Sequence, residues 1–201
     1  KEVKPMVFFV LFPVDPESFE HLKEALEKLS LNDASFTYAL DQSLALGLGF
    51  RCGFLGLLHM NIIQERLERE FMLNLISTAP SCSYEILLMD GSLQFIDNPS
   101  KFPEQQSIDE IREPMVKMTI HVPNEFLGNI IQLCVERRGI QLDMQYLTSE
   151  RVVLTYSLPL NEMMFDFYDE LKSLSKGYAS MDYEVTKYES SDLVKLDILL
   201  N

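Results

Sequence analysis

Hydrophobic and polar side chains alternate over residues 116–122, where every second position is apolar. A period of two predicts a β-strand with one buried face. Beyond this strand the apolar spacing becomes helical, in a segment that Asn124 can cap and Gly139 can end. The predicted buried face of this helix consists of Phe126, Ile130, Ile131 and Cys134.

The second half of the chain continues with two strand-like runs, 140–148 and 151–160, joined by a short polar turn. A helix is then predicted from Asn161 to Gly177, and a last strand covers 178–189. The apolar stripe of this helix consists of Met164, Phe167, Leu171 and Leu174. The resulting order is β-α-β-β-α-β, which is the split βαβ or ferredoxin-like unit.

The first half of the chain repeats this order of elements. Pro-Met-Val occurs at 5–7 and again at 114–116, in each case at a predicted strand followed by an acidic helix start. The expected elements are a strand over 6–12, a helix over 17–29, strands near 35–46 and 48–54, a helix over 57–71 and a strand near 73–78. We therefore predict an α+β protein with two ferredoxin-like domains in tandem, each an antiparallel sheet with two helices.

Two segments of the first half are less regular. The helix over 57–71 is expected to turn Leu58, Ile62 and Phe71 inward. The strand over 6–12 is apolar on both faces, unlike its counterpart in the second half. Its second face is expected either to pack against a neighbouring domain or to lie deeper in its own core.

Asp, Asn, Pro, Ser and Gln are concentrated between the two halves. This composition predicts a linker over 90–112, with one domain over 1–89 and the other over 113–201. Residues 81–89, just before the linker, are expected to extend the first sheet.

Composition limits the possible partners. Hydrophobic residues make up 47% of the 201 residues, which is enough for well-formed cores. The formal net charge is −14, and a field of that sign repels nucleic acid, so any RNA contact must be local. No apolar run reaches the roughly 18 residues of a transmembrane helix, and the apolar start lacks a signal-peptide cleavage site. The three cysteines are expected to be buried, reduced thiols.

The stretch 49–60, GFRCGFLGLLHM, combines glycines with an arginine, a cysteine and a histidine. A P-loop needs lysine and a hydroxyl residue directly after its second glycine, but leucines follow Gly56. Cys52 and His59 alone provide too few ligands for zinc. The remaining prediction is a tight turn between a strand and a helix, in which glycine allows close approach of the backbone.

Long runs of the chain closely resemble the LepA family of bacterial translational GTPases, the back-translocating elongation factors. They cover 31–43, 47–71, 113–139, 158–184 and 191–201. The resemblance implies the family's third domain followed by the domain that matches the fifth of elongation factor G, both ferredoxin-like. Cys82 stands where an apolar residue is expected, a small departure because a buried cysteine packs similarly.

The resemblance implies a ribosome-facing, non-catalytic role in back-translocation and the fidelity of protein synthesis. Its partners would be ribosomal RNA and proteins, with no small-molecule substrate. GTP and Mg²⁺ belong to the family's GTPase domain, whose P-loop and switch segments are not in this sequence, so no cofactor or enzyme activity is expected here. The resemblance also implies a cytoplasmic bacterial protein and a monomer, and allows peripheral association of the longer factor with the inner membrane.

Candidate RNA contacts fall into three groups. They are Arg51 with His59, Arg137 with Arg138, and Lys172, Lys176, Tyr178 and Ser180. Each group lies at a predicted helix end, where a phosphate can meet backbone amides or a cationic side chain. The alternatives are that His59 braces its turn, that Arg51 pairs with an acid, and that the lysines only complement the helix dipole.

Two other classes of function use paired ferredoxin-like units. One is a small-molecule sensor, and the other is an acylphosphatase-like enzyme, which needs an arginine in a phosphate-cradling loop and an asparagine on a strand. Arg51 is expected in a glycine-rich turn, but no asparagine is an evident partner for it. Both classes remain alternatives to the ribosome-facing role.

Overall fold

A computed structural model of the chain describes residues 5–98, 101–164 and 166–193. The chain divides into two compact units, residues 1–82 (unit 1) and 83–201 (unit 2). Within the described residues, no helix is long and apolar enough to cross a membrane.

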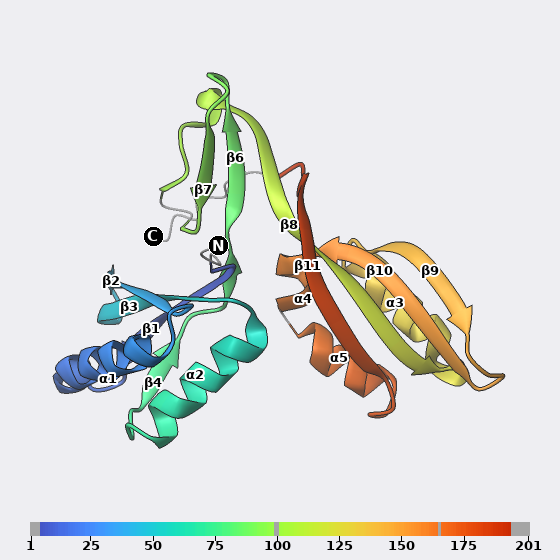
Figure 1. Ribbon diagram of the computed structural model, residues 1–201, viewed down its shortest axis with the longest axis horizontal. Coiled ribbons are helices and arrows are strands. Elements are labelled where there is room, and N and C mark those ends of the chain that lie inside the picture. The colour runs from blue at the N-terminus through green and yellow to red at the C-terminus, as the bar shows by residue number, and fades with distance from the viewer. Residues whose placement is uncertain (1–4, 99–100, 165, 194–201) are drawn as a thin grey trace. The chain divides into compact units, whose positions relative to one another are not determined.

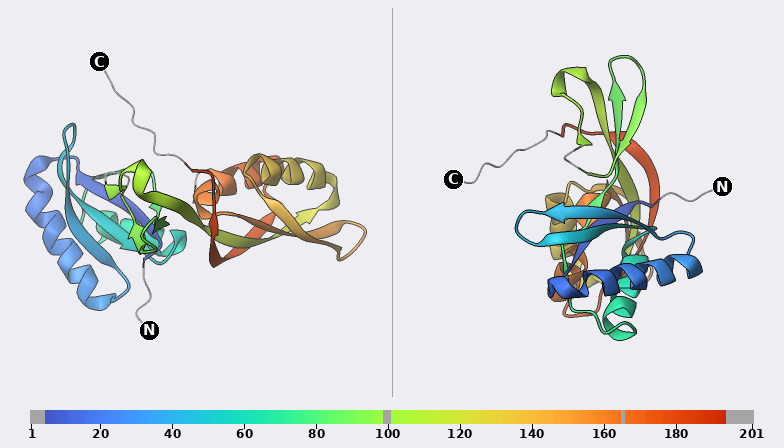
Figure 2. Two further views of the ribbon diagram at one scale, coloured as in Figure 1. Left: turned by 90° about the horizontal axis from the view of Figure 1, so that it is seen from above. Right: turned by 90° about the vertical axis from the view of Figure 1, so that its left-hand side faces the viewer.

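Unit 1 is an antiparallel sheet with two helices on one side (Figures 1 and 2). Its elements are β1 (Val7–Pro13), α1 (Phe19–Asn32), β2 (Thr37–Ser43), β3 (Gly47–Phe54), α2 (Leu57–Arg69), β4 (Leu75–Ser77) and β5 (Ser81–Cys82). The strand order is β2-β3-β1-β4, and β5 also pairs with β1. This order confirms the ferredoxin-like prediction for the first half.

The core of unit 1 is rich in aromatic rings on the helix side of the sheet. Phe9 of β1 and Phe54 of β3 stack with ring centroids 4.9 Å apart. Leu22, Leu26 and Leu29 of α1 are buried against them, at the helical spacing seen in the sequence. On the other side of the sheet, β3 lies so close to β1 that a Cβ on Gly49 would be 2.5 Å from the Phe12 ring. The second apolar face of β1 is therefore covered in part by its own sheet.

The inward face of α2 was predicted wrongly in part. Leu58 and Ile62 are 71% and 47% exposed, whereas Ile63 and Leu67 are buried. Apolar residues occur on two faces of this helix, so spacing alone does not decide which face packs inward. Phe71 follows the end of the helix and packs against the core, as expected.

Unit 2 contains a larger antiparallel sheet, with its helices on one side (Figures 1 and 2). Its elements are β6 (Tyr84–Leu88), β7 (Leu93–Ile96), β8 (Ile108–Pro123), α3 (Leu127–Glu136), β9 (Ile140–Tyr146), β10 (Arg151–Pro159), α4 (Leu160–Met164), α5 (Phe167–Leu174) and β11 (Ser180–Ser190). The central strands have the order β11-β8-β10-β9, and β6 and β7 extend the sheet along the first part of β8. The central strands and their helices again follow the ferredoxin-like order, and the chain is an α+β protein.

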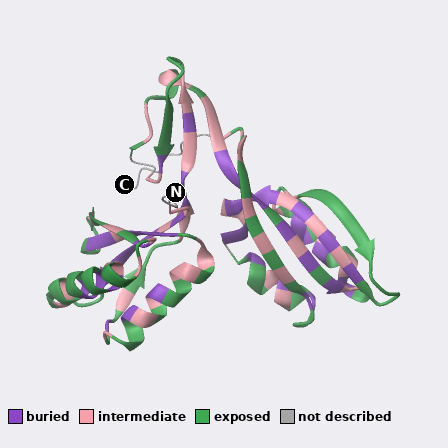
Figure 3. Ribbon diagram, viewed as in Figure 1, coloured by how far each residue is buried: buried purple, intermediate pink, exposed green. Residues whose placement is uncertain are grey.

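Among the strands of unit 2, burial is concentrated on β8 and β10 (Figure 3). Buried and less buried residues alternate along β10 and along the second part of β8, as the period of two predicts. The edge strand β9 is instead exposed at all seven of its positions.

The segment predicted as a linker, 90–112, instead contributes β7 and the first part of β8 to the sheet of unit 2. Asp90 and Gly91 form the turn between β6 and β7, with Gly91 at φ 81. The Asp90 side chain accepts a hydrogen bond from the Ser92 amide at 2.8 Å. An Asp-Gly pair between two strands is a hairpin signal, which the polar composition of the segment obscured. The boundary between the units also lies earlier than residue 89, because β6 pairs with β8 and only β5 joins the first sheet.

Two predicted helix boundaries in unit 2 also differ from the structure. Asn124 makes no capping bond, because a 3₁₀ turn over Asn124–Phe126 precedes α3. The helix predicted from Asn161 to Gly177 is two helices, α4 and α5. Asp166 lies between them in the left-handed conformation at φ 53, which aspartate tolerates better than most residues.

Candidate nucleic-acid interface

The turn after α5 is closed by a Schellman motif. The amide of Gly177 donates to the Lys172 carbonyl at 2.7 Å, and the amide of Lys176 donates to the Ser173 carbonyl at 3.2 Å. Lys176 and Gly177 are both left-handed, at φ 50 and φ 85. Glycine adopts this conformation freely, whereas for a residue with a side chain it costs roughly 1–2 kcal/mol. Lys176 therefore holds a position where glycine would be less strained.

Ser175 fixes the shape of this turn from inside. Its side chain is fully buried, and its Oγ donates to the Leu171 carbonyl at 2.8 Å. The same oxygen accepts a hydrogen bond from the Ala179 amide at 2.9 Å. The amide of Tyr178 donates to the Ser175 carbonyl at 3.0 Å. The backbone over 175–179 is thus held at several points, so the side chains of Lys176 and Tyr178 project from a fixed base.

Lys172 braces the turn rather than extending away from it. Its Nζ donates to the carbonyls of Ala179 at 2.5 Å and Gly177 at 3.3 Å. The ammonium also lies 5.5 Å from the centre of the Tyr168 ring. This geometry gives Lys172 a structural role in holding the end of α5 to the start of β11.

Tyr178 and Lys176 form an exposed aromatic and cationic pair around Phe126. The rings of Phe126 and Tyr178 are nearly parallel, with an interplanar angle of 9° and centroids 6.5 Å apart. The Lys176 ammonium lies 5.7 Å from the Phe126 ring centre. Phe126 is 7% exposed and Tyr178 is 70% exposed. We call Phe126, Lys176 and Tyr178 the aromatic corner; Phe126 directly precedes α3, and Lys176 and Tyr178 lie between α5 and β11.

Ser180 lies next to the aromatic corner, at the first position of β11. It pairs across the ladder with His121 of β8, and both residues are exposed. Ser180 can therefore add a hydroxyl group to a contact made at the corner.

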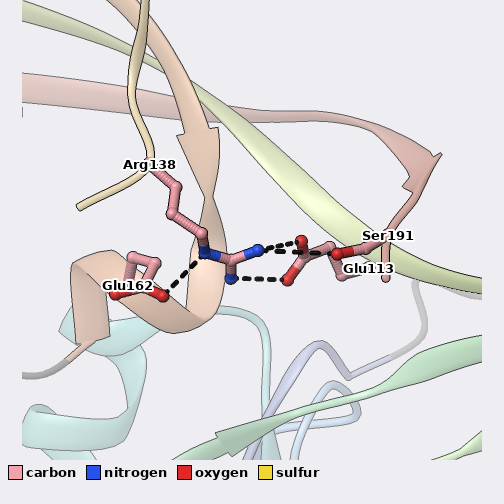
Figure 4. Close-up of polar contacts among 4 residues, drawn as sticks. All are labelled: Glu113, Arg138, Glu162 and Ser191. Atoms are coloured by element: carbon pink, nitrogen blue, oxygen red, sulfur yellow. Dashed lines mark hydrogen bonds and ion pairs between the residues drawn. The ribbon is translucent and has the colours of Figure 1, made fainter. Parts of the chain in front are cut away.

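Arg138, predicted as an RNA contact, is bound within unit 2 (Figure 4). Its guanidinium donates to both carboxylate oxygens of Glu113, at 2.8 and 3.1 Å, and to Glu162 at 2.9 Å. A further contact to the Ser191 hydroxyl measures 3.5 Å. Glu113 is only 3% exposed, and its hydrogen bonds raise the pKa of Arg138 above the ordinary value. The arrangement ties the end of α3 to β8 and α4.

The backbone at Arg138 repeats the geometry found at Lys176. Arg138 is left-handed at φ 57, and the Gly139 amide donates to the Cys134 carbonyl at 2.7 Å. Gly139 follows the end of α3, as expected, but the left-handed residue there is Arg138. Glycine is needed at 139 because a Cβ would lie 2.5 Å from the Cys134 oxygen. Arg137 pairs with Glu170 of α5 at 2.9 Å. Both arginines therefore have partners more than 20 residues away, which sequence reasoning did not identify.

His59 braces the turn before α2, one of the two alternatives for this residue. Its Nδ1 accepts a hydrogen bond from the Leu55 amide at 3.1 Å, and its Nε2 lies 2.7 Å from Asp33 Oδ2. Burial favours a higher pKa for Asp33, but the Ser35 amide and His59 outweigh it, so the pKa is lowered. The ring also packs edge-on against Phe54.

Arg51 does not share a site with His59. It lies within β3, between the buried residues Phe50 and Cys52, so its side chain is on the sheet face opposite the helices. Its guanidinium carbon is 5.7 Å from the centre of the Phe8 ring. Arg51 therefore lies on a strand and not in a phosphate-cradling loop.

No metal site is evident in the part of the chain that the structure describes, where no group of three or more His, Cys, Asp or Glu residues is suitably placed. Cys52 is fully buried, and this burial raises the pKa of its thiol well above the usual range. The three cysteines are free and buried, as expected.

Sequence reasoning missed Phe126 of the aromatic corner and Ser175, which holds the turn beneath it. Phe126 was assigned to the core because of its helical spacing, and Ser175 carried no distinguishing pattern. A signal was present in the run SKGYAS, where a lysine, a glycine and an aromatic residue follow a helical stripe. That run predicts a turn with exposed side chains, but it does not reveal the ring behind it.

Comparison with known proteins connects this geometry to a family. The model "Elongation factor G C-terminus" matches residues 110–199. All 201 residues align with curated proteins named elongation factor 4, at 59% identity in Oleidesulfovibrio alaskensis, 61% in Nitratidesulfovibrio vulgaris and 57% in Sorangium cellulosum. The chain belongs to the elongation factor 4 (LepA) family. It spans about one third of these relatives, which are translation factors by name: 33% of the first two and 34% of the third.

A solved structure supports the fold independently. A crystal structure of a protein from Thermus thermophilus matches with a TM-score of 0.57 and 18% sequence identity. The match covers 96% of this chain and 42% of the other. At that identity the likeness concerns the fold alone.

Proposed function

We propose that this chain is the ribosome-facing, non-catalytic part of a LepA-type translation factor and that it contacts ribosomal RNA through the aromatic corner. In this proposal the longer factor binds and hydrolyses GTP with Mg²⁺ in another part and acts in back-translocation and fidelity. No run of the form G-x-x-x-x-G-K-[ST] occurs in the 201 residues, which supports placing that chemistry outside this chain.

The observation that carries the proposal is the state of Lys176. Its side chain is exposed, and among the described residues its ammonium has no ion-pair partner, only the Phe126 ring. Arg138, at the equivalent position of α3, uses its left-handed backbone to reach Glu113. The backbone of Lys176 carries the same strain, but no ion pair among the described residues offsets it. We therefore assign the Lys176 side chain an external partner.

Electrostatics supports a small contact rather than a broad one. With a net charge of −14, the chain as a whole repels a polyanion. A lysine that is not neutralised by a carboxylate is then a focal point for a phosphate. Tyr178 beside it, and the hydroxyl of Ser180, offer the other groups that commonly contact RNA.

The test is co-sedimentation of the chain with ribosomes over a range of salt concentrations, for the wild type and Lys176→Ala. Each lost phosphate contact should lower the affinity and flatten the slope of log K against log[salt] by about 0.7–0.9. Lys187→Ala is the matched control, because Lys187 lies on β11, is 74% exposed and pairs with Glu189. Equal affinities and slopes for the wild type and Lys176→Ala would contradict the proposal.

A further inference from the structure

Tyr178 is presented in a way that suits a flat ligand. It is 70% exposed, although the Phe126 ring lies parallel to it. An open slot between the two rings would leave Phe126 accessible, but Phe126 is only 7% exposed. The accessible π-surface is therefore the outer face of Tyr178, with Phe126 as its support.

The backbone beneath this ring is rigid before any ligand arrives. The Tyr178 amide is bonded to the Ser175 carbonyl, and the next amide, that of Ala179, is bonded to the buried Ser175 hydroxyl. Lys172 holds the Ala179 carbonyl from the other side. Because the backbone that carries the ring is already held, a stacking ligand loses less entropy in fixing the ring.

A cation accompanies the ring at a fixed spacing. Lys176 is two residues before Tyr178, and both side chains are anchored by Phe126, one through its ammonium and one through its ring. A nucleotide combines a flat base with a phosphate in the same way. In a duplex both faces of a base are covered by its neighbours, so only an unpaired nucleotide can place its base on Tyr178.

We propose that the aromatic corner binds one unpaired nucleotide of an RNA loop, with its base stacked on Tyr178 and its phosphate near Lys176. This inference rests on the proposed function and deepens it, because it specifies unpaired RNA and not duplex RNA as the ligand. Stacking uses the π-face of the base, so little sequence preference is expected.

The experiment uses the 201-residue chain and a stem–loop RNA that carries 2-aminopurine at one loop position, titrated at low salt. The quenching of 2-aminopurine fluorescence reports stacking, and the same RNA with 2-aminopurine in the stem is the duplex control. We expect quenching for the loop position only. Tyr178→Ala should weaken binding by about 5- to 150-fold and abolish the quenching, whereas Tyr178→Phe should retain both.

Tyr146→Ala is the matched control, since Tyr146 is 57% exposed on β9, which β8 and β10 separate from β11 in the sheet order. A melting curve for each variant shows that it is folded. If Tyr178→Ala binds like the wild type while Lys176→Ala binds more weakly, stacking is overturned and the proposed function stands. If neither variant changes binding to the stem–loop or to ribosomes, both proposals fail. Equal losses in Tyr178→Phe and Tyr178→Ala would show a hydroxyl contact and overturn stacking.

Discussion

Lys176 and Arg138 occupy equivalent backbone positions but have different roles. Each is left-handed at the end of a helix, one residue before a glycine. Arg138 reaches the buried carboxylate of Glu113, so the strain of its backbone is offset by an internal ion pair. Lys176 reaches only an aromatic ring among the described residues. At the scale of single residues, this contrast separates a structural cation from a candidate RNA contact.

Replacing Arg138 tests the structural role. Arg138→Ala removes both donors from Glu113, a carboxylate that is 3% exposed, and should lower the free energy of unfolding by about 1–3 kcal/mol. Arg137→Ala, whose partner Glu170 is 44% exposed, should cost under ~1 kcal/mol. Equal losses measured by urea unfolding would contradict this assignment.

The lowered pKa of Asp33 predicts a specific dependence of fold stability on pH. Burial works to raise its pKa, but the Ser35 amide and His59 lower it below the ordinary value of 3.8. A carboxylate with a lowered folded-state pKa stabilises the fold above its unfolded pKa, and this contribution is lost as pH falls through the folded value. The stability difference between wild type and Asp33→Asn should therefore be largest near neutral pH and decline below pH ~4.

Thermal unfolding of the wild type and Asp33→Asn, measured at a series of pH values from neutral to acid, gives this stability difference. The control is Glu24→Gln, an exposed carboxylate on α1. A difference between wild type and Asp33→Asn that is constant with pH would contradict the role given to the His59–Asp33 contact.

At the scale of elements, the sequence predicts the order of strands and helices well. Period-two alternation over 116–122 and helical stripes with glycines behind them are local signals, and the strand pairing confirms both ferredoxin-like units. Two errors had physical causes. Leu58 and Ile62 continue an apolar pattern on the exposed face of α2, so the pattern did not single out the buried face. The polar composition of 90–112 concealed a hairpin whose strands pair with residues far along the chain.

The candidate site was less predictable than the fold. Lys176 and Tyr178 are neighbours in the sequence, so their turn could be inferred, but Phe126 lies 50 residues earlier and joins them only through tertiary packing. The partners of Arg138 and Arg137 are also distant in sequence. Whether a cation faces solvent or a buried acid depends on these long-range contacts, which local pattern does not encode.

Glycines in and after α3 give opposite predictions. Gly128 lies in α3, and apart from its chain neighbours and the backbone of its own helix no described atom stands within 4 Å of the place that a Cβ would take. Gly128→Ala should therefore stabilise the fold by about 0.5–1 kcal/mol. Gly139→Ala would place its Cβ 2.5 Å from the Cys134 carbonyl oxygen and should destabilise by ~1–3 kcal/mol. Urea unfolding of the two variants measures both values. Stabilisation by Gly139→Ala would show that the close approach is not needed.

At the scale of the whole molecule, each unit has its own sheet and helices. The Arg138 contacts, the aromatic corner and the β6–β7 hairpin all lie within residues 83–201. Unit 2 therefore contains every element that the account of the corner requires, and it should fold on its own.

Truncation tests this independence and the place of the hairpin. A fragment of residues 83–201 should unfold cooperatively, with the same denaturant midpoint for unit 2 as in the whole chain. A fragment of 113–201 lacks β6, β7 and the first part of β8, so it loses ladder bonds and the buried residue Ile86, and it should be less stable. Equal stability of the two fragments would favour the linker that the composition predicted. Failure of 83–201 to fold would contradict the independence of the units.

The most direct test of the central claim places a photo-crosslinker at the aromatic corner. Benzoylphenylalanine is introduced at position 178 in one variant and at position 146 on β9 in another, since both tyrosines are exposed and one lies outside the corner. Each variant is irradiated in complex with ribosomes, and the cross-linked RNA is measured. The account predicts a cross-link from position 178 to ribosomal RNA that is weakened by Lys176→Ala, with little from position 146. Equal RNA cross-linking from the two positions, or none from position 178, would contradict it.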